Sequence, residues 1–423
     1  MKPQSTHLHL TIVFSVASRS RNLRLLSMAT LVLPHLGHFN SLLSEDMTML
    51  TLVFVKSIPV NSCSAGGAEV YVHEVGRELT ERYCIDVIVV SSSESARAGT
   101  YTIDGVKYVL SRASSRYTFL LIAPYILRKL VRKLLDEGRE VIVVDEYTTY
   151  PFMTTKYLKN VPIMLLVHQL SYAVVSYQYK LPVEIAWSGE AILLRPYLST
   201  TCITVSPSVA MDLHDMGFKR VQIAEPGTPV EPLSDVPEKA DYPLITCVSR
   251  YVPYKRLEHI VYAAYIVKKY VPKFRVVVIG RGSCRYLVKL MNLVRELNLG
   301  KYVKLLYNVP LRQKLEILRK SWLHVVTSVY EGFNLAVLEA AACGTPTLAY
   351  AVRGLIDSVT YIGGYLLSDQ NYEKLASAIC SLINSPDDLF KRAELCLGRV
   401  KCLTWERTAE KLRNIIRNIL VEG

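Results

Sequence analysis

The sequence has no apolar run long enough to cross a bilayer, no Cys-x-x-Cys pair and no Lys/Arg tract of the nucleic-acid-binding type. A membrane span needs roughly 20 apolar residues, and zinc sites and disulfide frameworks need patterned cysteines. Nucleic-acid-binding segments usually concentrate their basic residues. The sequence therefore predicts a protein with no spanning helix, no metal or other cofactor, and no nucleic-acid partner.

The nine cysteines are scattered singly along the chain. An odd, unpatterned set is typical of a reducing compartment, so we expect a cytoplasmic protein. Cys84, Cys202 and Cys247 lie in apolar runs, where a thiol behaves as a small core side chain. We therefore expect these three residues to be buried.

Half of the 423 residues are hydrophobic and 21% are charged, which is enough apolar material for two or three domains. The formal net charge of +13 indicates an anionic partner such as a phosphate, a nucleotide or an acidic lipid. A solvated basic surface explains most of this excess, because the basic residues are dispersed.

Residues 1–48 show no clear hydrophobic period. We interpret them as an N-terminal extension, disordered or belonging to an overlong start, and a weak signal peptide is the alternative. Met47 and Met49 stand just before the first convincing strand, Leu50–Val55. We therefore predict that a protein starting at Met47 folds and keeps its activity.

Two alternating series of apolar strands and amphipathic helices follow, at 49–228 and 244–400, and a proline-rich linker at 229–243 joins them. Continuous apolar strands separated by helices predict parallel sheets covered on both faces. The fold class is therefore α/β, with two Rossmann-like doubly wound domains facing across a cleft. The last segment, 401–423, is expected to be a helix that returns to the first domain. The strands are expected at 50–55, 85–90, 141–144, 163–167, 202–205, 244–248, 274–279, 303–306, 323–326, 347–350 and 365–367.

The most informative stretch is Glu331-Gly-Phe-Asn-Leu-Ala-Val-Leu-Glu339. Its first acid lies in a Gly-containing loop after an apolar run, and its second acid lies in an expected helix. The backbone N–H groups of Phe333, Asn334 and Leu335 would point out of the helix start, which is a ready anion site. The motif predicts a helix start that holds a phosphate, with one acid at each end of a larger ligand. A surface helix with two solvated glutamates is the alternative.

Other candidate residues follow strands at the same edge of the expected sheets, where ligands bind in open α/β folds. They are Gly66 and Gly67 in the first domain, His168 after a later strand, and Arg250 with Lys255 in the second domain. Arg250 can hold a diphosphate as a bidentate fork and Lys255 as a point charge. Ordinary surface cations and a buried, satisfied histidine are the alternatives.

These motifs resemble those of the retaining, GT-B-fold glycosyltransferases of family 4 (glycosyl transferases group 1), over about residues 50–415. The family usually has Glu-Gly-Phe-Gly-Leu-Pro, whereas this sequence has Asn334 and Ala336 in place of the last Gly and the Pro. The Asn side chain would enter the sugar pocket. The resemblance rests on the acid pair with its Ala-Cys-Gly-Thr-Pro346 continuation, Gly66-Gly67-Ala-Glu69, Ser249-Arg250 with Lys255, Val278-Ile-Gly-Arg-Gly282 and Leu403-Thr-Trp-Glu406.

The resemblance implies a metal-independent enzyme of the EC 2.4 class that moves a hexosyl-type sugar from a nucleotide-diphosphate-sugar to an acceptor hydroxyl with retention of configuration. Arg250 and Lys255 would hold the diphosphate, and Glu339 would accept hydrogen bonds from the ribose. Glu331 would act as a catalytic residue on the transferred sugar. The remaining implied site residues are Gly332, Phe333, Asn334 and Leu335 on the donor, Gly66 and Gly67 facing it from the first domain, and His168 as a second catalytic residue at the sugar.

The resemblance leaves the acceptor open between a saccharide and a lipid-linked molecule. The apolar segment 117–135 carries Arg128, Lys129, Arg132 and Lys133, and a basic amphipathic helix can lie on an anionic membrane. Peripheral contact with the inner face of the membrane is therefore one expectation, and a helix packed on its own protein is the other.

Two other functions fit the same architecture. A sugar-nucleotide epimerase would form products without an acceptor, and a non-catalytic glycosyltransferase-like subunit would keep the fold and lose turnover. The presence of Arg250, Lys255, Glu331 and Glu339 favours the enzyme over the inactive subunit.

Overall fold

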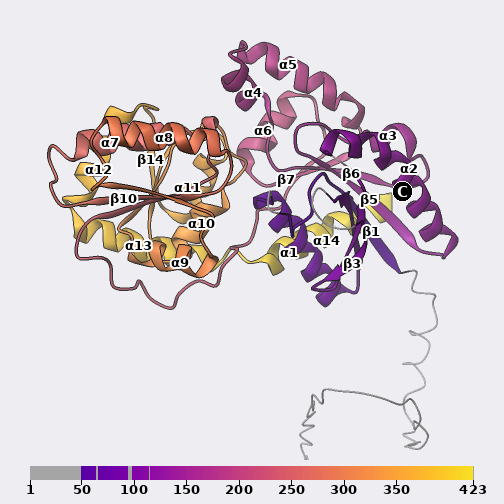
Figure 1. Ribbon diagram of the computed structural model, residues 1–423. Helices are drawn as coiled ribbons and strands as arrows, with labels where there is room; N and C mark the ends of the chain where they lie inside the picture. The colour runs from indigo at the N-terminus through magenta and orange to yellow at the C-terminus, as the bar shows by residue number, and fades with distance from the viewer. Residues whose placement is uncertain (1–48, 63–64, 94–97, 114, 423) are drawn as a thin grey trace, which may run out of the picture. The chain divides into compact units, whose positions relative to one another are not determined.

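The computed structural model describes residues 49–62, 65–93, 98–113 and 115–422, so the expectations about residues 1–48 lie outside the described residues. The described chain belongs to one compact unit and forms two sheets, each flanked by helices (Figure 1). Both sheets are built from parallel strands except at one edge, which confirms the α/β class and the two doubly wound halves.

The first sheet has the strand order β3-β4-β2-β1-β5-β6-β7-β8, and every neighbouring pair is parallel except β3–β4. Its strands are β1 (Leu50–Val55), β2 (Asp86–Ser92), β3 (Gly99–Ile103), β4 (Val106–Ser111), β5 (Glu140–Tyr147), β6 (Ile163–Val167), β7 (Thr201–Thr204) and β8 (Val221–Ile223).

Alternate residues of β1 enter two different cores. Leu52 and Phe54 pack in the cluster shared with α1, whereas Val53 and Val55 pack in the cluster shared with α2. Both faces of a parallel sheet are buried in this way, which is why its strands are continuously apolar. The helices here are α1 (Gly67–Tyr83), α2 (Arg116–Asp136), α3 (Thr154–Tyr157), α4 (Tyr172–Tyr179), α5 (Val183–Leu194), η1 (Arg195–Tyr197) and α6 (Pro207–Asp215).

The second sheet has the order β11-β10-β9-β12-β13-β14 and is parallel throughout. Its strands are β9 (Leu244–Val248), β10 (Arg275–Gly280), β11 (Val303–Tyr307), β12 (Leu323–Val326), β13 (Thr347–Tyr350) and β14 (Tyr365–Leu367). Its helices are η2 (Pro253–Lys255), α7 (Leu257–Val267), α8 (Cys284–Glu296), α9 (Leu311–Lys320), α10 (Leu335–Ala342), α11 (Leu355–Ile362), α12 (Tyr372–Ile383) and α13 (Pro386–Val400), and α14 (Trp405–Glu422) ends the chain.

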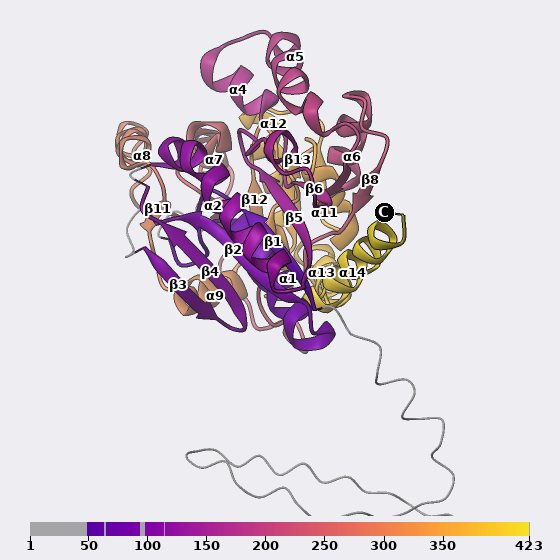
Figure 2. The same ribbon diagram turned by 90° about the vertical axis from the view of Figure 1, so that its right-hand side faces the viewer.

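Four local features differ from the expectations, and the first is the short strand β8, which lies outside the expected strand positions. Strands β3 and β4 form an antiparallel hairpin whose turn, Asp104-Gly105, has φ angles of 46° and 79°. Asp-Gly between two strands is a strong signal for such a turn, so this hairpin could have been predicted. Helices α4 and α5 also form a hairpin, seen at the top of Figure 2, which sequence analysis did not identify. Cys84 is exposed because it ends α1 in the left-handed conformation, whereas Cys202 and Cys247 are buried as predicted.

The chain passes between the two sheets twice, and the two crossings lie side by side. Thr228 N donates to the carbonyl of Leu403 at 2.8 Å, and a Cβ on Gly227 would lie only 2.4 Å from the backbone nitrogen of Trp405. A glycine is therefore required at this close approach. After the second crossing, α14 packs against α1.

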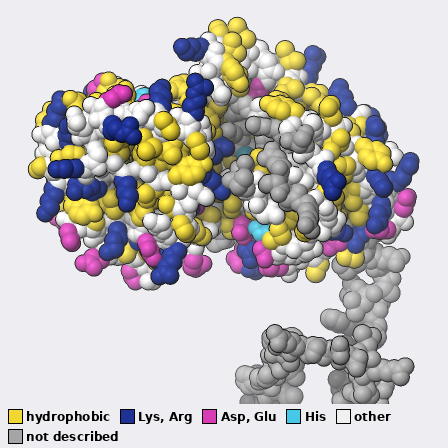
Figure 3. All heavy atoms as spheres, in the orientation of Figure 1, with side chains coloured by type: hydrophobic (Ala, Val, Ile, Leu, Met, Phe, Trp, Pro, Cys, Tyr) yellow, Lys and Arg dark blue, Asp and Glu magenta, His cyan; other side chains and the backbone are white. Residues whose placement is uncertain are grey.

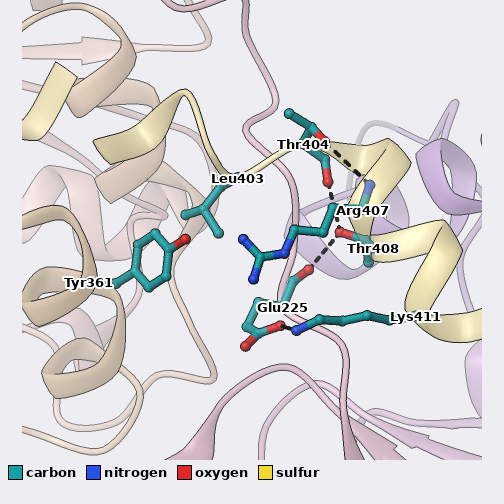
Figure 4. Close-up of a pocket in the computed structure, with 7 residues that line it drawn as sticks. All are labelled: Glu225, Tyr361, Leu403, Thr404, Arg407, Thr408 and Lys411. Carbon is teal, nitrogen blue, oxygen red and sulfur yellow. Dashed lines mark hydrogen bonds and ion pairs between the residues drawn. The ribbon is translucent and has the colours of Figure 1, made fainter. Parts of the chain in front are cut away.

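Side chains of α14 bind Glu225, which lies just before the first crossing between the sheets (Figure 4). Thr408 Oγ1 donates to the Glu225 carbonyl at 2.6 Å, and the Lys411 ammonium pairs with the Glu225 carboxylate. Arg407 extends toward Tyr361, which belongs to α11 of the second domain. The small cavity between these groups has a volume of about 10 Å³.

Candidate functional site

Glu331 lies in the loop that follows β12 and is almost completely buried, as is Lys255 at the end of η2. Three donors converge on one oxygen of this carboxylate: the Lys255 ammonium, Ser328 Oγ at 2.6 Å and Asn334 Nδ2 at 3.0 Å. Among the described residues, no donor reaches Oε2 of Glu331. The structure therefore brings Lys255 and Glu331 together and leaves one carboxylate oxygen for a ligand.

Asn334 is the N-cap of α10 and has a φ of 74°, in the left-handed region. Its Oδ1 accepts from Ala336 N at 3.1 Å while its Nδ2 donates to Glu331. The side chain is thus bound to its own loop and helix at both ends. No described residue accepts a hydrogen bond from the backbone N–H groups of Phe333 or Leu335, so these groups are open to an anion at the helix start.

Glu339 lies on the same helix, and the Lys314 ammonium of α9 donates to its Oε1 at 2.7 Å. Its side chain is 12% exposed. Arg250 is exposed and donates to the hydroxyl of Tyr254, whose ring centroid lies 5.2 Å from the Lys255 nitrogen. Arg250 therefore lies next to the buried Lys255–Glu331 pair with most of its hydrogen-bonding capacity unused.

Loops of the first domain approach this site closely. A Cβ on Gly332 would lie 1.8 Å from the carbonyl oxygen of His168, and a Cβ on Gly67 would lie 3.3 Å from the Leu335 side chain. The predicted residues His168 and Gly67 are therefore brought to the start of α10. Gly332 in particular cannot be replaced without moving the two loops apart.

A buried charged cluster lies beneath His168. Lys56 Nζ donates to Glu146 Oε1 at 3.1 Å and lies 3.3 Å from Glu69 Oε1. His168 Nε2 is 2.9 Å from the same oxygen of Glu146, and Gly66 N donates to Glu69 at 2.6 Å. Burial alone would lower the pKa of Lys56, but the charges of Glu146 and Glu69 outweigh it and raise that pKa above its ordinary value.

Sequence analysis missed Lys56 and Glu146 and listed Glu69 only as part of a motif. The available signal was positional, because Lys56 ends the apolar run of β1 and Glu146 lies near the end of the apolar strand β5. It also missed Arg256, which is buried and donates to the carbonyls of Thr327 and Ser328, both at 2.8 Å. Arg256 therefore holds the loop that carries Glu331.

A second contact between the domains is centred on Asp212 of α6. Its carboxylate accepts from the hydroxyl of Tyr330 at 3.0 Å and from that of Tyr172 at 3.2 Å, and it pairs with Arg353 at 3.2 Å. Burial raises the pKa of Asp212, and the charge of Arg353 opposes this shift. Tyr330 directly precedes Glu331, so this contact also fixes the position of the loop that carries Glu331.

Basic side chains are scattered over the face of the molecule shown in Figure 3. A groove of about 910 Å³ beside α2 gathers several of them, and Arg128, Lys129, Arg132, Lys133 and Lys159 contribute to its lining. In the part of the chain that the structure describes, no group of three or more His, Cys, Asp or Glu residues is arranged to hold a metal ion. No described helix is long and apolar enough to cross a membrane.

Comparison with solved structures shows the fold. The chain is similar to sucrose-phosphate synthase from Thermosynechococcus elongatus, with a TM-score of 0.73, 20% identity, and coverage of 88% of this chain and 100% of that chain. It is also similar to HepE from Anabaena, solved in complex with UDP and glucose, with a TM-score of 0.63, 14% identity, and coverage of 87% and 100%.

Comparison with curated proteins finds D-inositol 3-phosphate glycosyltransferases. The protein from Thermobispora bispora is 28% identical over 230 residues, which are 50% of this chain and 53% of that protein. The one from Rhodococcus erythropolis is 31% identical over 184 residues, 42% of each chain. The chain spans about half the length of the curated relatives it matches.

Two family models match consecutive parts of the chain. Glycosyltransferase Family 4 matches residues 65–231, which hold the Gly66-Gly67 loop and every strand of the first sheet except β1, and Glycosyl transferases group 1 matches residues 233–395, which hold the acid pair. Together with the two doubly wound sheets, these matches show that the chain belongs to the GT-B-fold glycosyltransferases of family 4.

Proposed function

We propose that the protein transfers a sugar from a nucleotide-diphosphate-sugar to an acceptor hydroxyl with retention of configuration. The observation that carries the proposal is the arrangement at Glu331, where Lys255, Ser328 and Asn334 all bind one oxygen and leave the other without a donor. A carboxylate held in one orientation in this way can accept hydrogen bonds from sugar hydroxyls at no cost of reorganisation.

The neighbouring groups match the parts of such a donor. The open N–H groups at the start of α10 suit a phosphate, and Arg250 with Lys255 supplies positive charge for the second phosphate. Glu339, held by Lys314, suits the ribose hydroxyls at the other end of the motif. HepE was solved with UDP and glucose, which supports a donor of this class.

The proposed reaction breaks the bond between the anomeric carbon and the diphosphate oxygen, and the electron pair leaves with the diphosphate. The acceptor oxygen bonds to the same face of the anomeric carbon, and its proton passes to the departing phosphate oxygen. Arg250, Lys255 and the helix start stabilise the charge that develops on the diphosphate. We propose that this set acts without a metal ion.

The first experiment is a thermal-stabilisation screen of nucleotide-sugars, because a donor that binds only the native state raises its melting temperature. The donor found in this way is then given to the enzyme with candidate acceptors, in excess EDTA and with magnesium. We expect turnover in EDTA. Loss of turnover that magnesium restores would contradict the metal-free site, and products formed without any acceptor would indicate an epimerase.

We further propose a cytoplasmic protein that contacts an anionic membrane through α2 and reaches a lipid-linked acceptor there. Leu121 and Tyr125 of this helix are 82% and 71% exposed, and Arg128, Lys129 and Lys133 follow them on the next turns. Exposed apolar side chains beside a row of cations complement an anionic lipid surface. The described cysteines are all unpaired, which supports a reducing compartment.

Co-sedimentation with vesicles tests this contact. We expect binding to vesicles with phosphatidylglycerol, weaker binding at high salt, and none to vesicles of phosphatidylcholine alone. The double variant Arg132→Glu/Lys133→Glu should lose the binding, and Lys301→Glu/Lys304→Glu, with the same charge change on exposed residues of the second domain, should keep it. Equal binding of both double variants would contradict the proposal.

A further inference from the structure

We propose that Glu146 is a positioning residue that holds the imidazole of His168 with its Nε2–H toward Glu146, so that Nδ1 is the ring nitrogen presented to substrate. The proposal rests on the proposed function, because it assigns a task to a residue beside the site of sugar transfer. It concerns two side chains on neighbouring strands, at the end of β5 and just after β6.

Lys56 shows which group donates and which accepts in the contact between Glu146 and His168. Lys56 Nζ donates to Glu146 Oε1 at 3.1 Å, and an ammonium group can only donate. Glu146 Oε1 is therefore an acceptor. His168 Nε2, 2.9 Å from the same oxygen, must then carry the hydrogen between them. Among the described residues, none forms a hydrogen bond with His168 Nδ1.

The charges around Glu146 keep this arrangement in place. Lys56 and Glu146 are at most 1% exposed, so the ring is anchored to a part of the protein that solvent does not reach. The second oxygen of Glu146 is buried and has no hydrogen-bond partner among the described residues, and Lys56 is shared with Glu69. Two carboxylates thus face one lysine. Glu69 has Gly66 N as a further donor, and the imidazole N–H gives Glu146 its second donor beside Lys56.

The position of His168 makes its orientation matter for the reaction. Its carbonyl oxygen lies against Gly332, next to Glu331, and its side chain is 13% exposed. The ring also meets Tyr71 edge-to-face at a centroid distance of 5.0 Å. Glu146 on one side and Tyr71 on another leave the ring one orientation, and a fixed tautomer decides whether the free nitrogen accepts or donates.

The first test is the side-chain 15N NMR spectrum of the full-length protein with labelled histidine, with His168 assigned by comparison with His168→Ala. We expect the Nε2–H tautomer for neutral His168 in the wild-type protein. An Nδ1–H tautomer would overturn the proposal. Because this measurement needs no substrate, it decides the proposal even if no sugar transfer is found, which would instead count against the proposed function.

The second test is a double-mutant cycle with the donor found by thermal stabilisation. Glu146→Gln should lower kcat by about 10-fold to 100-fold, as loss of an orienting partner usually does, with the donor KM changed less than about twofold. Adding Glu146→Gln to His168→Ala should lower kcat by no more than about a further twofold. Multiplying effects, or equal effects on kcat and KM, would overturn the positioning role.

Glu78→Gln is the matched control, because Glu78 is also a buried carboxylate of the first domain but pairs with Arg77 and Arg82 instead. It should keep kcat within about twofold of the wild-type value. If Glu146→Gln does not fold, Glu146→Leu replaces it, since that variant leaves one lysine facing one glutamate. A full rate in a folded Glu146→Leu protein would also overturn the proposal.

Discussion

The two domains bury glutamates at the same edge of their sheets but balance the charges differently. In the second domain each acid has a lysine of its own, Lys255 for Glu331 and Lys314 for Glu339. In the first domain a single lysine, Lys56, serves both Glu69 and Glu146. In the second domain each lysine balances the charge of one glutamate. In the first domain one lysine faces two glutamates, so Glu146 depends on a further hydrogen-bond donor, His168.

This difference matches the roles that we propose for the two domains. A paired lysine and glutamate can exchange partners when a diphosphate and a sugar arrive, since Lys314 and Glu339 are partly exposed and Glu331 binds its donors through one oxygen. Lys56 and Glu146 are sealed from solvent and cannot rearrange cheaply, because burying an unpaired charge is costly. We therefore expect the charged groups of the second domain to change partners when a ligand binds, and those of the first domain to keep their positions.

Removing Lys56 should have the largest effect on stability. Lys56→Met leaves two buried carboxylates without their shared cation, and we expect a loss of about 3–5 kcal/mol in the free energy of unfolding. Urea denaturation followed by circular dichroism measures it. Lys56→Met/Glu146→Leu, which leaves one buried acid instead of two, should recover part of the loss. A Lys56→Met protein within about 1 kcal/mol of the wild type would show that the cluster is not structural.

Substitutions of Glu331 and Glu339 should affect different steps, the first mainly kcat and the second mainly nucleotide affinity. Glu331→Gln keeps the shape of the side chain and should lower kcat by about 100-fold, because its charge matters most as the sugar–phosphate bond breaks. Glu339→Gln should mainly weaken nucleotide affinity, since its proposed contact with the ribose is present throughout the reaction. Steady-state kinetics and nucleotide titration measure the two effects. Equal loss of nucleotide affinity in both variants would contradict the assignment of Glu331 to catalysis and Glu339 to nucleotide binding.

His324 contrasts with His168, because its partners are uncharged. It is fully buried on β12, where its Nε2 accepts from Val248 N at 3.3 Å and its Nδ1 faces Thr347 Oγ1 at 3.1 Å. Burial lowers the pKa of His324 to about 3. In the unfolded chain His324 binds a proton below about pH 6.5, whereas in the folded protein it stays neutral down to about pH 3. The contribution of this histidine to the free energy of unfolding is therefore fully present above pH 6.5 and decreases as the pH falls toward 3.

The expected loss from this histidine is about 2 kcal/mol at pH 5 relative to pH 8. His324→Gln retains an acceptor for Val248 N but cannot titrate, so its stability should change less over the same range. Urea denaturation of both proteins at pH 8 and pH 5 measures the difference. The same acid sensitivity in both proteins would assign the effect to other groups.

Lys314→Met should have the smallest effect. Glu339 keeps its position on α10 and loses only the cation that orients it, so nucleotide affinity should fall by on the order of 1 kcal/mol, or about fivefold. Lys320→Met is the control, because Lys320 is an exposed lysine at the end of the same helix α9. Unchanged affinity in Lys314→Met would show that Glu339 needs no partner.

Periodicity predicted most of the fold, since β1, β6, β9, β12, β13 and β14 begin and end where the apolar pattern places them. It also predicted which residues lie at the sheet edge, including Lys255, Glu331 and His168. It could not show that Glu331 pairs with Lys255, because the two are 76 positions apart and are brought together only by the pairing of β9 with β12. The Lys56 cluster was not predicted for the same reason, because Lys56 and Glu146 are 90 positions apart in the sequence.

The close contact between Thr228 and Leu403 suggests that the second domain can be removed or exchanged as one segment of the chain. The second domain leaves and re-enters the first at neighbouring points, so residues 229–402 form an insertion within a continuous first domain. A short bridge from Thr228 to Leu403 would close the first domain without stretching it. The segment that carries Glu331 and Glu339 could then be exchanged as a cassette, with α14 still packed on α1.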